Sequence, residues 1–115
     1  MITEAMVRKL ALSMPEAVES SHFDVADFRV RKKIFATIHP TGKSGALLRV
    51  GVDQTATLAD SDPETFKSAG GGGALIVQFA RVGKAHYGHL IEQAWRAIAP
   101  KKALAARDAQ RGKFA

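Results

Sequence analysis

The N-terminal segment has the hydrophobic spacing of an amphipathic helix. Apolar side chains recur about one helical turn apart at Met6, Val7, Leu10, Ala11 and Met14. Thr3 is suited to cap the first turn, because its hydroxyl accepts a hydrogen bond from a free backbone N–H group. Pro15 disfavours the helical conformation for the residue before it, so the helix is predicted to end there.

From residue 25 the period of the pattern shortens to two, which is typical of strands. In the segment 34–39, one face holds Ile34, Ala36 and Ile38, and the other holds Phe35, Thr37 and His39. The pattern predicts strands over 25–30, 34–39 and 47–52, with a tight turn at 31–33 and a second turn at 40–45. Strands joined by turns this short pair antiparallel, so we expect a three-stranded meander.

After this meander, the pattern predicts short helices and then a break. Asp53 is expected to cap a helix over 53–60. A second helix is expected with Ser61 or Asp62 as its cap, because Pro63 is well suited to the first helical position. Four glycines at 70–73 then interrupt the chain.

The last part of the chain contains the clearest helix. An apolar run predicts a buried strand over 74–82, and the following segment 84–99 carries one apolar stripe: Tyr87, Leu90, Ile91, Ala94, Trp95 and Ile98. Pro100 ends this helix, and a further one is predicted over 103–110. Strands followed by helices in this order indicate an α+β fold with helices packed on an antiparallel sheet.

Length and charge complete this interpretation. The 115 residues suit a single domain over 1–115, and the absence of cysteine excludes disulfides and thiolate chemistry. The net charge is +6. Residues 1–80 hold nine basic and nine acidic side chains, and residues 81–115 hold eight and two, so the excess lies in the C-terminal third. The segment 101–115 is expected to be a basic helix or tail, suited either to phosphate or to solubility.

Other candidate chemistry finds little support. Thr41-Gly42-Lys43-Ser44 lacks the upstream glycine of a phosphate-binding loop, and His86 with His89 supplies only two metal ligands. Glu19, His22, Asp24 and Asp27 could supply an acid and a base, but the sequence contains no Gly-x-Ser-x-Gly nucleophile elbow. We therefore expect no enzyme activity, no cofactor and no metal; a pocket lined by His22, His39 or His86 would reopen the question. No apolar run is long enough for a membrane span and the N-terminus lacks a signal-peptide pattern, so a cytoplasmic protein is expected.

An ordered set of short segments resembles the MmcQ/YjbR-like family: Pro15, Glu19, Phe28-Arg29-Val30, Lys33-Ile34-Phe35-Ala36, Asp62-Pro63-Glu64-Thr65-Phe66, Ala94-Trp95-Arg96 and Ala99-Pro100-Lys101-Lys102. The resemblance covers about residues 3–105. It implies a secretion-chaperone-like fold with the order helix, three strands, helix, two strands, helix. It also implies DNA binding with a double-wing arrangement, carried over here only at Arg29, Lys33, Lys101 and Lys102. The glycines at 70–73 depart from the family pattern.

Two hypotheses for function remain. In the first, the protein binds the phosphate backbone of DNA through a basic hairpin turn and the basic C-terminal segment. The candidate residues are Arg29, Arg31, Lys32, Lys33, Lys101, Lys102 and Arg107. In the second, the domain is an adaptor that binds another protein or a second copy of itself. The first hypothesis requires the two basic segments to share one face.

Overall fold

The computed structural model describes residues 1–70 and 72–112, with no side-chain description at 111 and 112. The described elements, in chain order, are α1 (Glu4–Leu12), β1 (Val18–His22), β2 (Val25–Val30), β3 (Lys33–Ile38), β4 (Ser44–Leu47), α2 (Val52–Ser61), β5 (Phe66–Ala69), β6 (Ala74–Gln78), α3 (Lys84–Arg96) and α4 (Lys101–Gly112). This order confirms the expected α+β arrangement, with two late strands rather than the single one that periodicity alone predicts.

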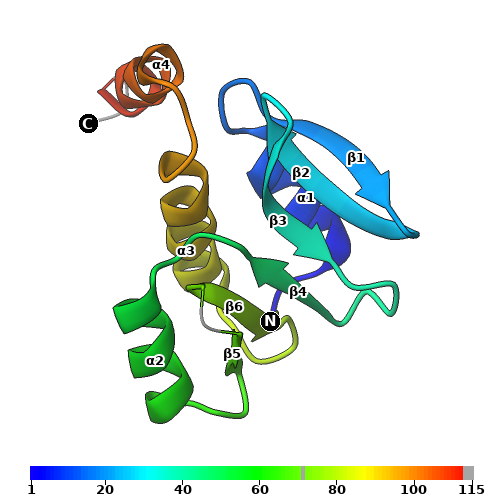
Figure 1. Cartoon of the computed structure of the whole chain (residues 1–115). Helices are drawn as coiled ribbons and strands as arrows, with labels where there is room; N and C mark the ends of the chain where they lie inside the picture. Colours follow the sequence, from blue (N-terminus) through cyan, green and yellow to red (C-terminus); the bar gives the residue numbers. More distant parts are fainter. Residues whose placement is uncertain (71, 113–115) are drawn as a thin grey trace.

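The six strands form one antiparallel sheet in the order β1-β2-β3-β4-β6-β5 (Figure 1). The first four strands follow one another as a meander. The chain then forms α2 and returns as β5 at the far edge, and β6 fills the space between β5 and β4. The sheet therefore has two edges, β1 and β5.

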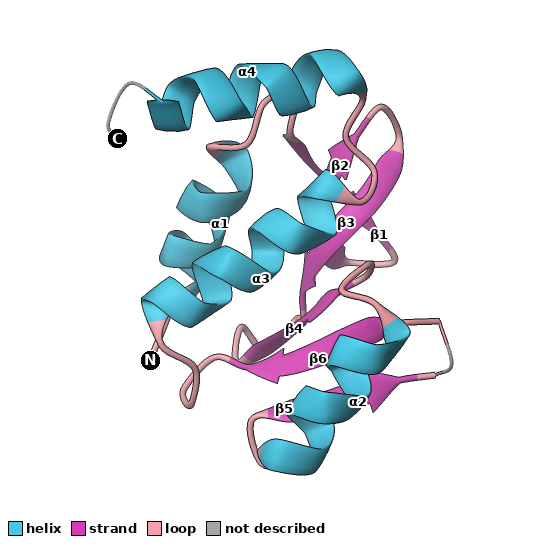
Figure 2. Ribbon diagram, turned by 90° about the vertical axis from the view of Figure 1, so that its left-hand side faces the viewer, coloured by secondary structure: helices cyan, strands magenta, loops and turns pink. Residues whose placement is uncertain are grey.

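Helices α1 and α3 lie against one face of the sheet (Figure 2). The predicted apolar stripes are buried there: Val7, Ala11 and Met14 from the N-terminal segment, and Tyr87, Leu90, Ile91, Ala94 and Trp95 from α3. Thr3 caps α1 as expected, with its hydroxyl accepting from the Met6 N–H at 3.2 Å. The Trp95 indole donates to the Pro15 carbonyl at 3.1 Å, which ties the end of α3 to the segment after α1.

A β-bulge in β3 breaks the alternation predicted for the segment 34–39. Phe28 pairs with Ala36, but the next residue of β2, Arg29, pairs with Ile34, so β3 has one extra residue. Phe35 and Ala36 are consequently both fully buried, whereas the pattern placed them on opposite faces.

Two further predictions of local structure are wrong, and a third has the wrong C-terminal end. The strand predicted over 47–52 lies instead at Ser44–Leu47, where Gly45 lets β4 approach the Thr37 carbonyl so closely that a Cβ would collide with it. The helix predicted after Asp62 is a single turn followed by β5, which buries Phe66. The strand predicted over 74–82 ends at Gln78. The pattern did not predict β1, because an exposed edge strand needs few apolar side chains.

The core also contains a polar atom without a partner. The Tyr87 ring packs edge-on against Phe79, and its buried hydroxyl forms no hydrogen bond with a described residue. Burial raises the pKa of Tyr87, so its phenol stays neutral at physiological pH. We predict that Tyr87→Phe leaves the free energy of unfolding unchanged or raises it by up to about 1 kcal/mol, because an unsatisfied group is removed. Urea unfolding of the two proteins tests this, and a clear loss of stability would mean that the hydroxyl is hydrogen-bonded in solution.

Candidate nucleic-acid interface

The first basic segment is a two-residue turn between β2 and β3. Val30 pairs with Lys33, so only Arg31 and Lys32 form the loop, and Lys33 is the first residue of β3. Both loop residues have positive φ angles, 49° and 72°, which turns of this type normally accommodate with Asn and Gly. The three side chains at positions 31–33 are exposed. The chain thus keeps cationic side chains where the backbone geometry favours other residues.

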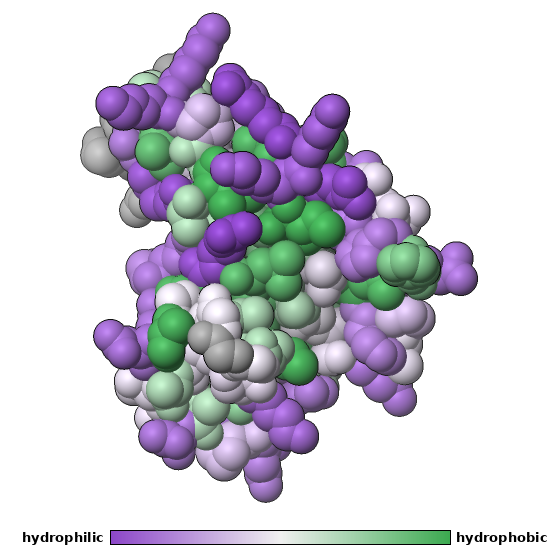
Figure 3. Space-filling view, in the orientation of Figure 1, coloured by the Kyte–Doolittle hydropathy of each residue, from purple (hydrophilic) through white to green (hydrophobic). Residues whose placement is uncertain are grey.

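The second basic segment is the start of α4. Lys101 and Lys102 lie in the first turn of this helix and are exposed. Figures 1 and 2 both place the start of α4 and the β2–β3 turn at the same end of the molecule. In Figure 3, hydrophilic side chains extend from this end, and hydrophobic surface lies below them over β3 and β4. The two segments, distant in sequence, therefore lie at one end of the fold.

Arg29 contributes less positive charge than predicted, because it is bound to a buried carboxylate. Asp27 has no exposed surface; it accepts from Arg29 Nε at 2.6 Å and Nη2 at 3.0 Å, and it lies 2.7 Å from His22 Nδ1. The hydrogen bonds from Arg29 hold the pKa of Asp27 below its ordinary value of 3.8. Asp27 is therefore ionised and already paired, which makes it unsuited to acid–base chemistry.

The other two predicted arginines also form ion pairs. Arg31 Nε lies 3.0 Å from Glu16 Oε1 in an exposed pair, whereas Arg107 binds the mostly buried Glu92 with Nη2 at 2.9 Å. By contrast, four of the predicted residues form no ion pair with a described acidic side chain: Lys32, Lys33, Lys101 and Lys102. We call these four residues the lysine surface.

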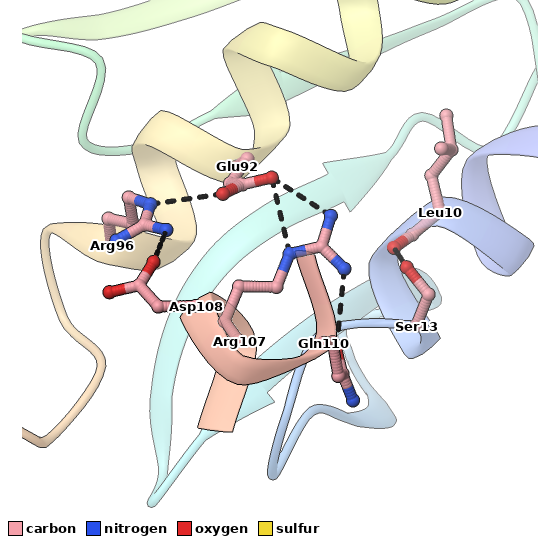
Figure 4. A network of polar contacts seen from close by, with 7 residues as sticks. All are labelled: Leu10, Ser13, Glu92, Arg96, Arg107, Asp108 and Gln110. Carbon is pink, nitrogen blue, oxygen red and sulfur yellow. Dashed lines mark hydrogen bonds and ion pairs between the residues drawn. The ribbon is translucent and has the colours of Figure 1, made fainter. Parts of the chain in front are cut away.

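Figure 4 shows the network around Glu92, which joins α3 to α4. Glu92 accepts from Arg96 Nε at 3.0 Å, and from Arg107 Nη2 at 2.9 Å and Nε at 3.3 Å. Asp108 accepts from Arg96 Nη2 at 2.6 Å, and Gln110 accepts from Arg107. Hydrogen bonds to Asp108 and Glu92 raise the pKa of Arg96. The two arginines and two carboxylates balance in charge, so this part of α4 adds little to the positive surface.

Sequence spacing contained a signal for two of these pairs. Asp27 and Arg29 are two residues apart on a strand, which puts them on the same face, and Glu92 and Arg96 are four apart on a helix. The pairs of Arg31 with Glu16 and of Arg107 with Glu92 depend on how distant elements pack. Spacing along the chain gives no signal for them.

The remaining candidate residues lie apart from one another. Glu19 binds Arg8 on α1 at 3.2 Å, and the His86 ring packs against Phe66 at 5.5 Å. Among the described residues, no three histidine or acidic side chains are grouped as metal ligands. A groove of about 680 Å³ is lined by the start of α1 and residues 41–43, and none of His22, His39 and His86 lines it.

The glycine run at 70–73 has a structural role at its last position. Gly73 has a φ of 81°, and a Cβ there would meet the backbone of Gly51 and Val52 at about 3.0 Å. Its carbonyl accepts from the Gly51 N–H and the Thr55 hydroxyl, which fixes the start of α2. Gly71 of this run and residues 113–115 of the predicted basic tail lie outside the described residues. Within those residues, none of the helices has the length and apolarity that crossing a membrane requires.

The Asp27 pair has a consequence for stability against pH. Folding lowers the pKa of Asp27. The Asp27 pair therefore contributes its full stability above about pH 4, and this contribution is lost as pH falls through the pKa that Asp27 has in the folded protein. We predict that Asp27→Asn is less stable than wild type at pH 6 and that the difference narrows towards pH 2. Urea unfolding at several pH values measures it. The control is Asp24→Asn, an equal charge change on the same hairpin; if both variants behave alike, the pair does not stabilise the fold.

Comparisons with known proteins agree with this fold. The YjbR family model matches residues 12–97. The crystal structure of Deinococcus radiodurans protein DR2400, with a DUF419 domain, superposes with a TM-score of 0.76 over 89% of this chain and 82% of that chain, at 18% identity. At that identity the likeness concerns the fold alone. Comparison with curated proteins gives no match.

Proposed function

We propose that this chain, which belongs to the YjbR family, is a non-enzymatic cytoplasmic protein that binds duplex DNA through the sugar-phosphate backbone. The contacts are assigned to Lys32 and Lys33 at the β2–β3 turn and to Lys101 and Lys102 at the start of α4. Arg31 joins them, because an exposed ion pair such as the one with Glu16 is weak and exchanges readily with phosphate. Arg29 and Arg107, in contrast, are held by carboxylates.

One observation carries this proposal: two basic segments from distant parts of the chain lie at one end of the fold, and their lysines form no ion pair with described carboxylates. A lysine ammonium group is a flexible point charge that attracts phosphate without reading base edges. Binding of this kind gains free energy from released counterions. It is therefore expected to be weak, sensitive to salt and independent of sequence.

A titration of labelled duplex DNA at several salt concentrations tests the proposal. Five phosphate contacts, four from lysines and one from Arg31, predict that the logarithm of the binding constant falls against the logarithm of salt with a slope of about −4.5. Two duplexes of unrelated sequence are expected to bind alike. Absence of binding at about 20 mM salt, or a slope near zero, would contradict DNA binding through this surface.

One exposed residue favours an adaptor function as the second candidate. Phe23 lies at the tip of the β1–β2 turn, is 98% exposed and has a φ of 48°. Both the exposure of a large apolar ring and a left-handed backbone conformation are unfavourable for phenylalanine. It lies at the opposite end of β2 from the β2–β3 turn, so a protein bound at Phe23 leaves the lysine surface accessible. Binding of a partner that is lost in Phe23→Ser and retained when the four lysines are changed to Gln would favour this function.

A further inference from the structure

We propose that Glu92 is a latch that docks α4 on α3 and keeps the guanidinium groups of Arg96 and Arg107 from anionic ligands. The inference rests on the proposed function, since DNA phosphate is the ligand that would compete with Glu92 for these groups. Two conformations are implied: the docked one, and a released one in which Arg107 loses Glu92 and Arg96 loses Asp108. The latch thus regulates how many cations the protein presents.

The apolar contribution to the docking of α4 is small. Of its described side chains, Ala103 is buried and Leu104 is partly buried, while most of the others are exposed. An isolated helix of twelve residues is marginally stable in water, so α4 depends on its contacts for its position. The four-residue link at 97–100, which contains Pro100, separates α4 from α3, so α4 is not a continuation of that helix.

The polar contribution is concentrated on one carboxylate. The Glu92 side chain is only 13% exposed and accepts hydrogen bonds from both arginines, one on α3 and one on α4. Asp108 of α4 completes the link by binding Arg96 at 2.6 Å. Charge-assisted bonds to a partly desolvated carboxylate are stronger than those of the exposed pairs elsewhere on this surface.

The same geometry opposes phosphate binding at these arginines. A phosphate that takes Arg107 must displace Glu92, which would leave a mostly buried carboxylate without that partner. The guanidinium group and the carboxylate can separate without this cost only if α4 moves away and solvent enters. Release of α4 is therefore coupled to the separation of Arg107 from Glu92 and of Arg96 from Asp108, whereas the Arg96–Glu92 pair within α3 can persist. An anion that prefers the released state shifts the equilibrium towards it.

The variant Glu92→Gln tests the latch, because it keeps the side-chain shape and removes the charge. Without DNA, we expect the backbone amides of 101–110 to exchange hydrogen faster than in wild type. With duplex DNA at about 50 mM salt, we expect affinity to rise about tenfold and the salt slope to steepen by about one to two units, as one or two further phosphate contacts form. The control Asp60→Asn removes an exposed carboxylate of α2 and makes the same change in net charge.

A second variant separates release from charge. Arg107→Gln also breaks the latch, so α4 should again exchange faster, but DNA affinity should not rise because a cation is lost. Unchanged exchange in both variants would overturn the latch, as would equal DNA affinities of Glu92→Gln and Asp60→Asn. Complete absence of DNA binding in every protein would overturn the proposed function instead, and hydrogen exchange alone would then decide the docking role of Glu92. Fluorescence of the buried Trp95 verifies that each variant is folded.

Discussion

Replacing Arg31-Lys32 with Asn-Gly is expected to stabilise the protein and weaken its DNA binding. Both residues occupy left-handed backbone conformations that Asn and Gly adopt at low cost, so relief of strain favours the folded variant. Loss of the exposed Arg31–Glu16 pair offsets a small part of this gain. We expect a net increase of about 1 kcal/mol in unfolding free energy, or about 5 °C in Tm. Two fewer cations are expected to reduce DNA affinity at least tenfold at 0.1 M salt.

The matched control is the other two-residue turn of the same sheet. Phe23 and Asp24 also have positive φ angles, and their replacement with Asn-Gly relieves similar strain away from the lysine surface. This control should gain stability and keep its DNA affinity. Thermal unfolding and DNA titration are measured on both variants. If the Arg31-Lys32 replacement gains stability but binds DNA as wild type does, the turn is not part of the interface.

Local patterns predicted those elements whose burial follows one regular period. The α1 and α3 stripes are buried as expected, because one face of each helix meets the sheet along its length. The bulge at Phe35 could not be predicted, since it depends on how β2 and β3 pair. Gly45 has the appearance of a turn residue in sequence, yet it lies in β4 because the Thr37 carbonyl leaves no room for a side chain. Contacts between neighbouring strands decide the burial of Phe35 and the strand position of Gly45, and a local pattern does not contain them.

In the candidate site too, local sequence predicted some features, and contacts between distant elements decided the others. Net charge and its location along the chain pointed to the β2–β3 turn and to the C-terminal segment, and the fold places both at one end. Counting cations along a sequence, however, does not show which of them are already neutralised. Asp27 and Glu92 reduce the charge of Arg29 and Arg107, and the second of these pairings exists only because α4 packs on α3. Of the seven candidate residues, only the four lysines form no ion pair with a described carboxylate.

Changing all four residues of the lysine surface to Gln is expected to reduce duplex affinity by on the order of a thousandfold at 0.1 M salt. The reason is that each lost lysine–phosphate contact forfeits the release of about one counterion, so the salt slope should shrink by about four units. All four side chains are exposed and form no ion pair with described residues, so the fold should be unaffected. Fluorescence anisotropy of a labelled duplex measures affinity, and circular dichroism verifies folding.

The control is a second quadruple variant, which makes the same change in net charge at four lysines outside the lysine surface. Lys9, Lys43, Lys67 and Lys84 are exposed and likewise form no ion pair with described acidic residues, and they lie on α1, the 39–43 turn, β5 and α3. If attraction depended only on net charge, both quadruple variants would lose affinity equally. Two double variants, one with Lys32 and Lys33 changed to Gln and one with Lys101 and Lys102 changed to Gln, then measure the contribution of each segment separately. Equal reductions in slope from each pair require that both contact one duplex, whereas loss from a single pair would contradict a shared surface.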